Sequence, residues 1–199
     1  MLAVWLFWWK NNSIYCIIIY GDLMITLRSN NVTFYGNRGM TLEEDINITN
    51  EYYKEENIAL IHKKPIPIKV LKINSSKTRI LDGFYEKKST LDYNGVYQGK
   101  YIEFDAKETN NKTSFPLANV HDHQIEHINN VLCHGGIIFL IVRFNLLNKT
   151  YLLLGQDLMN FVSSEKRKSI PIDYFEEKCK KIELKYRPRL DYIKLIDIL

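Results

Sequence analysis

The sequence has few cysteines, lacks an apolar run long enough to cross a membrane, and contains no internal repeat. Its three cysteines, Cys16, Cys133 and Cys179, are far apart and form no Cys-x-x-Cys pair. Neither a disulfide framework nor a thiolate zinc site is therefore expected. A reducing, cytoplasmic location fits this cysteine usage.

The N-terminal segment is apolar, but it matches neither a membrane span nor a secretory signal. Residues 2–9 and 14–20 are strongly apolar, and a polar tetrapeptide separates them, so neither run spans a bilayer. The segment also lacks an initial positive charge and a small-residue cleavage site. We expect residues 1–34 to form a disordered leader or arm. We also expect translation to begin at Met24, with residues 1–23 being an upstream reading artefact or part of that leader.

The composition is that of a folded domain with a basic central stretch. The 199 residues are 46% hydrophobic and 25% charged, which argues against disorder, and this length suits one sizeable core. We therefore expect a single domain over residues 35–199. Residues 62–100 contain nine cations and three acids in a chain of net charge +4, and this local excess permits an anionic partner.

The pattern of apolar and turn residues predicts an α/β fold with a mixed sheet flanked by helices. Thr41 and Glu44 form a capping box at the start of a helix that ends near Asn57. The nearly continuous apolar run at 137–144 is typical of a strand covered on both faces. Further strands are expected at 58–62, 66–73, 79–85, 96–97, 100–107 and 151–154, with turns at Gly95 and Gly99, and helices at 120–132, 156–163 and 171–180, before a terminal segment near Asp191.

Two carboxylates and one lysine form the most informative motif. Asp92 and Asp105 are thirteen residues apart, and Lys107 follows two residues after Asp105. In a strand at 100–107, Glu103, Asp105 and Lys107 lie on one face, and the intervening turns can return Asp92 to the same place. Two carboxylates on neighbouring strands can hold magnesium, which assists phosphodiester cleavage. A lysine beside the ion can orient the attacking water and offset developing charge, so the motif predicts nuclease chemistry.

Six short blocks in a fixed order strengthen this interpretation. The blocks are Tyr35–Met40, Lys63–Pro65, Thr90–Gly95, Asp105–Thr109, Thr113–Leu117 and His123–His127. Together they resemble the RecU family of bacterial Holliday junction resolvases, over the stretch from about Tyr35 to about Leu158. The resemblance implies a restriction-endonuclease-like core, a homodimer, magnesium dependence with Mn²⁺ as a substitute, and symmetric paired nicking of four-way junction DNA in recombinational repair. It also suggests a recombinase and a branch-migration motor as partners.

The resemblance assigns roles to individual residues. The family's magnesium ligands match Thr90, Asp92, Asp105 and Gln124, and its transition-state-stabilising lysine matches Lys107. The basic hairpin at about 66–86 is similar to the family's protruding stalk, which enters the junction centre. Phosphate contacts of this kind position DNA without reading its sequence. The expected DNA contacts are Arg38, Lys69, Lys72, Lys77 and Arg79.

Two features depart from the family pattern. Asp105 stands where the family more often has glutamate. Because aspartate is one methylene shorter, the metal would have to shift or the strand would have to come closer. The apolar leader stands where the family has a polar, basic N-terminal arm, so DNA contacts made by such an arm are not carried over.

Two other functions fit parts of the sequence. His123, Glu126 and His127 also match the His-x-x-Glu-His pattern of a zinc metallopeptidase, with two imidazoles at helical spacing. This alternative leaves the motif from Thr90 to Lys107 unexplained. A junction-binding protein without catalysis would use the basic hairpin alone, if Asp105 spoiled the metal geometry.

Overall fold

The computed structural model describes most of the chain. The described residues are 4–10, 13–20, 23–28, 41–76, 79–85 and 90–196. The chain divides into two compact units, Met1–Met40 and Thr41–Leu199.

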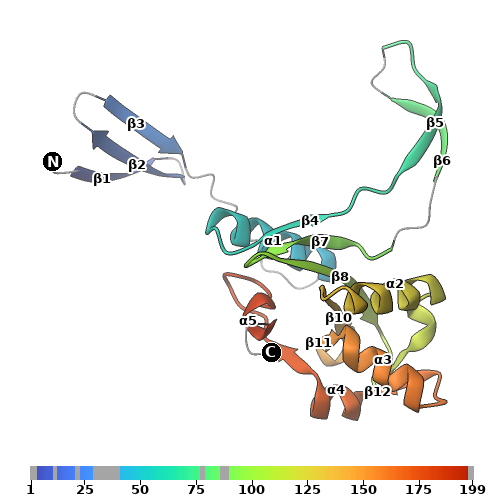
Figure 1. Cartoon of the computed structure of the whole chain (residues 1–199). Helices are drawn as coiled ribbons and strands as arrows, with labels where there is room; N and C mark the ends of the chain where they lie inside the picture. Colours follow the sequence, from blue (N-terminus) through green and yellow to red (C-terminus); the bar gives the residue numbers. More distant parts are fainter. Residues whose placement is uncertain are drawn as a thin grey trace. The chain divides into compact units, whose positions relative to one another are not determined.

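The first unit contains a small antiparallel sheet (Figure 1). Its strands β1 (Val4–Lys10), β2 (Ser13–Tyr20) and β3 (Leu23–Arg28) pair in chain order. The structure therefore has three strands where the sequence predicts a disordered leader. A start of translation at Met24, which lies within β3, stays a prediction.

The second unit is built on a six-stranded sheet with the strand order β13-β11-β10-β8-β7-β4. β8 and β10 are parallel neighbours, and every other neighbouring pair in this sheet is antiparallel. The mixed central sheet predicted from the sequence is therefore confirmed. Its strands are β4 (Leu60–Lys63), β7 (Tyr93–Tyr97), β8 (Lys100–Thr109), β10 (Ile137–Phe144), β11 (Lys149–Leu154) and β13 (Lys180–Ile182).

Helices cover both faces of this sheet. Ile138 and Leu140 of β10 belong to a buried cluster with residues of α2 and α3, whereas Phe139 and Ile141 pack with residues of α1 and α5. This burial of both faces explains why the strand is apolar throughout. The helices are α1 (Leu42–Glu55), α2 (Asp122–Cys133), α3 (Gly155–Ser164), α4 (Ile172–Lys178) and α5 (Ile193–Ile196).

Short elements complete the second unit. A separate antiparallel pair, β9 (Ser114–Pro116) and β12 (Ser169–Pro171), was not predicted from the sequence. Two single 3-10 turns, η1 (Leu117–Asn119) and η2 (Asn145–Leu147), follow β9 and β10. Within the described ranges, no helix has both the length and the apolar character needed to cross a membrane.

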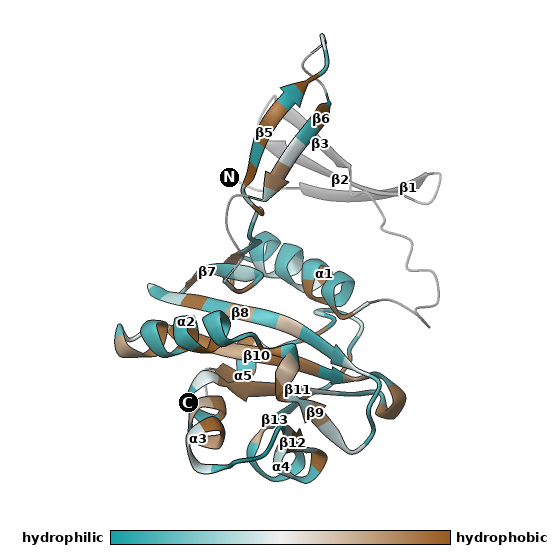
Figure 2. Ribbon diagram, turned by 90° about the vertical axis from the view of Figure 1, so that its right-hand side faces the viewer, coloured by the Kyte–Doolittle hydropathy of each residue, from teal (hydrophilic) through white to brown (hydrophobic). Residues whose placement is uncertain are grey.

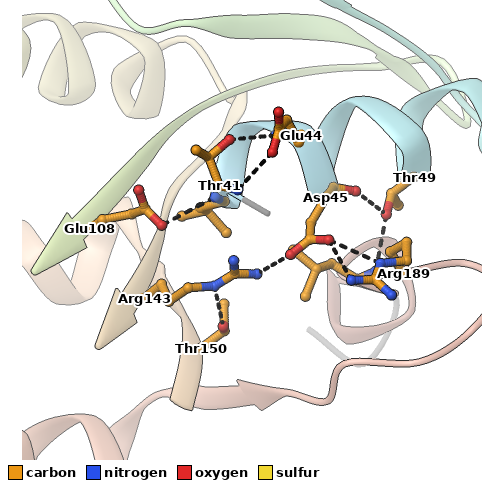
Figure 3. Close-up of polar contacts among 10 residues, drawn as sticks. Thr41, Glu44, Asp45, Thr49, Glu108, Arg143, Thr150 and Arg189 are labelled. Carbon is orange, nitrogen blue, oxygen red and sulfur yellow. Dashed lines mark hydrogen bonds and ion pairs between the residues drawn. The ribbon is translucent and has the colours of Figure 1, made fainter. Parts of the chain in front are cut away.

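α1 begins at the predicted capping box, in which Thr41 and Glu44 exchange hydrogen bonds between side chain and backbone. The buried carboxylate of Asp45 then ties this helix to two distant segments (Figure 3). Arg143 Nη2 of β10 donates to Asp45 Oδ2 at 2.6 Å, and Arg189 Nη2 donates to Asp45 Oδ1 at 2.8 Å. This network holds α1 against the sheet and the C-terminal segment, and removal of one partner would leave buried charge uncompensated.

Three stacked aromatic rings set the register at the centre of the sheet. Tyr93 of β7, Phe104 of β8 and Phe139 of β10 lie opposite one another, with neighbouring ring centroids 4.9 and 4.8 Å apart and nearly parallel planes. All three side chains are fully buried in the cluster that includes α1. Successive strand residues point to opposite faces, so Asp105, which follows Phe104, points away from this cluster.

Gly95 lies inside β7, and the prediction of a turn at this position is wrong. A Cβ at Gly95 would lie 2.1 Å from the carbonyl oxygen of Leu60, so glycine is required where β4 approaches β7. The turn between β7 and β8 consists of Gln98 and Gly99, with φ of 48° and 76°. The predicted turn at Gly99 is therefore confirmed.

A hairpin of two exposed strands projects from the body that contains the six-stranded sheet (Figures 1 and 2). β5 (Ile68–Ile73) and β6 (Ile80–Tyr85) pair antiparallel, with an irregularity between Val70 and Ile73. Every residue of both strands is exposed, and polar and apolar residues are interspersed along them (Figure 2). A hairpin lies at the predicted place, about 66–86. Its surface includes apolar side chains as well as Lys69 and Lys72, and its character as a basic stalk stays a prediction.

Replacing Phe104 by alanine should lower the free energy of unfolding by about 3–5 kcal/mol, because the change removes the middle ring of the stack and leaves a cavity. The matched control is Phe84→Ala on the hairpin, where the residue is 51% exposed. We expect that control to change stability by about 0.5 kcal/mol or less. Urea unfolding followed by circular dichroism measures both variants. Equal losses in the two would contradict the role assigned to the aromatic stack.

Candidate functional site

One face of β8 carries polar side chains at every second position, Glu103, Asp105 and Lys107. α2 lies against this face. Gln124 Nε2 donates to Asp105 Oδ2 at 2.9 Å, and His127 Nε2 lies 2.8 Å from Glu103 Oε2. Gln124 and His127 are three residues apart, nearly one helical turn, so they meet strand residues two positions apart. The shared face predicted from the sequence is therefore observed.

Asp92 meets Asp105 across the two strands. Tyr93 pairs with Phe104, so the antiparallel register places the residue before Tyr93 against the residue after Phe104. The two carboxyl groups are close enough to share a hydrogen bond when one of them carries a proton. Burial, and then the neighbouring Asp105 carboxyl, raise the pKa of Asp92 to about 6. The two predicted carboxylates are thus brought together at the same place.

Asp105 is buried, with 1% of its surface exposed. One of its two carboxylate oxygens has polar partners and the other has none among the described residues. Oδ2 accepts from Gln124 Nε2 and forms an ion pair with Lys107 Nζ, both at 2.9 Å. Oδ1 is buried and has no hydrogen-bond partner among the described residues. A buried oxygen of this kind is costly, and a divalent cation with oxygen ligands would remove the cost. The residues present therefore fit a metal ion of the magnesium type.

Gln124 connects the remaining predicted residues to this pair. Its Nε2 donates to the carbonyl oxygen of Thr90 at 2.8 Å, and its Oε1 accepts from the His121 N–H at 3.2 Å and from Lys107 Nζ at 3.4 Å. The Gln124 amide thus links β8, the backbone of Thr90 and the start of α2. The structure thus gathers all five residues predicted for catalysis or metal binding: Thr90, Asp92, Asp105, Lys107 and Gln124.

Glu103 and Lys64 also belong to this site, although neither was predicted from the sequence to act in catalysis or metal binding. Lys64 Nζ donates to Thr90 Oγ1 at 2.7 Å and to the Glu103 carboxylate. Burial acts to raise the pKa of Glu103, but hydrogen bonds from Lys64, His127 and Tyr101 outweigh it and hold the pKa below its ordinary value. The sequence did contain one indication that Glu103 belongs to the site: it lies two residues before the predicted metal ligand Asp105, on the same face of the strand.

Three of the five cations predicted to contact DNA lie on the hairpin or directly beside one of its strands. Lys69 and Lys72 are on β5 and Arg79 directly precedes β6, and all three are exposed. Lys69 Nζ lies 5.9 Å from the centroid of the Phe84 ring. Lys77 and Arg38 lie outside the described residues. Contacts of these five cations with DNA stay a prediction.

The histidines of α2 do not form the cluster that a zinc metallopeptidase would need. His127 contacts Glu103, and the His123 ring stacks on His121 with centroids 5.5 Å apart. In the part of the chain that the structure describes, no three His, Cys, Asp or Glu side chains gather as a metal site. The candidate magnesium site combines two carboxylates with uncharged oxygens and is therefore of a different kind.

Comparison with known proteins gives a consistent family match. Residues 37–198 match the model of the family described as RecU, Recombination protein U. The Holliday junction resolvase RecU of Geobacillus sp. strain WCH70 is 53% identical over 169 residues, which cover 82% of this chain and 84% of that relative. The proteins of the same name from Geobacillus kaustophilus and Pediococcus pentosaceus are 52% and 48% identical, with the same shares covered.

The raised pKa of Asp92 leads to a pH-dependent stability of the metal-free protein. The pKa of Asp92 is about 6 in the folded protein, and its ordinary value is 3.8. The contribution of Asp92 to the free energy of unfolding is therefore complete below about pH 4 and is lost as the pH rises through 6. Asp92→Asn should therefore raise the free energy of unfolding by about 1–2 kcal/mol at pH 7.5, after allowance for solvent screening, with little change at pH 4.

Urea unfolding in EDTA at the two pH values measures this difference. The control is Asp173→Asn, because Asp173 is an exposed aspartate on α4. Between pH 4 and pH 7.5, the wild type should lose more free energy of unfolding than Asp92→Asn does. Equal losses would contradict the close approach of the two carboxyl groups.

Proposed function

This chain belongs to the RecU family, and from that premise we propose that it is a magnesium-dependent endonuclease that resolves Holliday junctions by symmetric paired nicks in homologous recombination and DNA repair. Its relatives are named Holliday junction resolvases, which supports endodeoxyribonuclease activity. One observation carries the proposal: buried Asp105 keeps an oxygen without a partner among the described residues, opposite Asp92 and beside Lys107. The mixed, helix-flanked sheet is compatible with a restriction-endonuclease-like core.

Thr90, Asp92, Asp105 and Gln124 would hold Mg²⁺, with Mn²⁺ as a substitute. Two carboxylates together with uncharged oxygens suit such a hard cation. When bound, the ion would offset negative charge on the scissile phosphate and lower the pKa of a water molecule. Asp105 suits this role despite being shorter than glutamate, because its carboxylate already reaches Lys107 and Gln124 at 2.9 Å.

Lys107 supplies a fixed positive charge next to the carboxylates. Its side chain is 18% exposed, and its Nζ is held by Asp105 Oδ2 at 2.9 Å and Gln124 Oε1 at 3.4 Å. Gln124 accepts from one of its three N–H groups, so the ammonium can donate another to the attacking water or to a phosphate oxygen. A compact ammonium placed there compensates the charge that builds on the phosphorane.

The hairpin would supply the main phosphate contacts through Lys69, Lys72, Lys77 and Arg79, with Arg38 as a further contact. Its exposed strands carry cations on a surface that can enter an open junction. A two-fold homodimer would present two equivalent sites to strands of like polarity, which accounts for symmetric nicks. A recombinase and a branch-migration motor are the partners we propose for the assembled enzyme.

Lys107→Ala and Asp92→Asn should each lower the rate of nicking on a synthetic four-way junction by about 100-fold or more, because each removes transition-state charge stabilisation. Junction binding in EDTA should be retained. The control is Lys112→Ala, an exposed lysine in the loop after β8, and a linear duplex tests structure selectivity. Wild-type nicking by Lys107→Ala would contradict its role, and binding without nicking by the wild type would favour a non-catalytic junction-binding protein.

The double variant Lys72→Ala/Arg79→Ala should weaken junction binding by about tenfold at moderate salt. It should also reduce the slope of log affinity against log salt by about 2, because each phosphate contact contributes about 0.9 to that slope. Mobility-shift titrations at several salt concentrations measure both quantities. Lys178→Ala/Lys180→Ala, which removes two exposed lysines from the C-terminal part, serves as the control. An equal loss in both double variants would reject the hairpin as the DNA-binding element.

A further inference from the structure

Glu103 is a second buried carboxylate on the same face of β8 as Asp105, and its oxygens are fully used. The residue is 1% exposed. Oε1 accepts from Lys64 Nζ and from Thr90 Oγ1, the latter at 3.2 Å, while Oε2 accepts from Tyr101 Oη and His127 Nε2, both at 2.8 Å. A carboxylate has about four acceptor positions, so four donors saturate it.

The contrast with Asp105 separates two roles for neighbouring acids. Asp105 Oδ1 is buried without a hydrogen-bond partner in the described part of the chain. Glu103 would have to give up at least one of these four hydrogen bonds before it could bind a cation. Asp105 therefore suits a metal ligand, whereas Glu103 suits a residue that orients other groups.

The group that Glu103 orients is the hydroxyl of Thr90. A threonine hydroxyl has one proton and two lone pairs. In the structure the proton is directed to Glu103 Oε1 at 3.2 Å, and one lone pair accepts from Lys64 Nζ at 2.7 Å. One lone pair is left for a cation. A hydroxyl can ligate a cation only when its proton points elsewhere, and Glu103 is the acceptor that directs it.

We propose that Glu103 is a positioning residue that, together with Lys64, orients the Thr90 hydroxyl as a ligand of the divalent cation. This inference rests on the proposed function, because it concerns the same metal site. Outer groups that orient ligands typically change metal affinity by about 10–100-fold when they are removed. The effect of Glu103 should therefore be visible in metal binding by the protein without DNA.

Calorimetric titration of Mn²⁺ into the full-length protein without junction tests the proposal. Glu103→Met, which removes every acceptor, should weaken Mn²⁺ affinity by about 10–100-fold. Glu103→Gln keeps one oxygen that can face Thr90 and Lys64, so its affinity should stay within about threefold of wild type. Equal losses in the two variants would show that Glu103 acts through its charge alone, and unchanged affinity in Glu103→Met would also overturn the proposal.

Thr90→Val provides a second route that leaves Glu103 in place. It should lower Mn²⁺ affinity about as much as Glu103→Met, and the double variant should lose no more than either single one, because both act through the same hydroxyl. Should Glu103→Met fail to fold by circular dichroism, Thr90→Val still tests the ligand role of the hydroxyl, on which the proposal depends. Wild-type affinity in Thr90→Val would mean that there is no ligand for Glu103 to orient.

Asp45→Asn is the matched control, since Asp45 is also about 1% exposed and is bound to two arginine side chains, away from the site. It should lower the unfolding temperature and leave Mn²⁺ affinity within about twofold of wild type.

Failure of the proposed function and failure of the role of Glu103 give different results. A wild-type protein that neither binds Mn²⁺ nor nicks junctions would refute the metal-dependent nuclease, whereas tight binding by both wild type and Glu103→Met would refute only the role of Glu103.

Discussion

Three stacked rings, Tyr93, Phe104 and Phe139, hold β7, β8 and β10 in one register, and the site depends on that register. Because side chains alternate between faces, a shift by one residue would turn Asp105 into the apolar cluster and Phe104 towards Gln124. Such a shift would expose a large aromatic surface and bury a charge without partners. The packing that stabilises the sheet therefore also places Asp92 against Asp105.

Asp45, Glu103 and Asp105 are all about 1% exposed, yet their surroundings differ. Asp45 is neutralised by two arginines, and Glu103 accepts from four donors. Asp105 keeps one oxygen without a partner among the described residues and faces Asp92. The fold tolerates this buried oxygen without a hydrogen bond because the surrounding packing determines the position of β8. Functional sites commonly contain such an unfavourable local feature. A cation bound to this oxygen would satisfy it, and that interaction would contribute to the affinity for the cation.

Local patterns predicted most of the elements. The apolar run at 137–144 is a strand with the predicted bounds, the capping box at Thr41 starts α1, and glycine ends α2 as expected. The turn predicted at Gly95 was wrong, because glycine marks both turns and close approaches of backbone, and the approach of β4 is a long-range feature. The pair β9 and β12 was missed because three-residue strands carry too little periodicity to be recognised.

The sequence by itself determined which groups could meet. A spacing of thirteen residues with a two-residue turn at Gly99 pairs Asp92 with Asp105, and the alternation of β8 adds Lys107 on the same face. It did not distinguish Glu103 from Asp105, which are two acids at equivalent alternating positions. Only the tertiary structure decided between them, because Lys64, 39 residues away, and His127, 24 residues away, saturate Glu103. Hydrogen-bond saturation depends on which distant segments come within about 3 Å, and a local pattern carries no information on that.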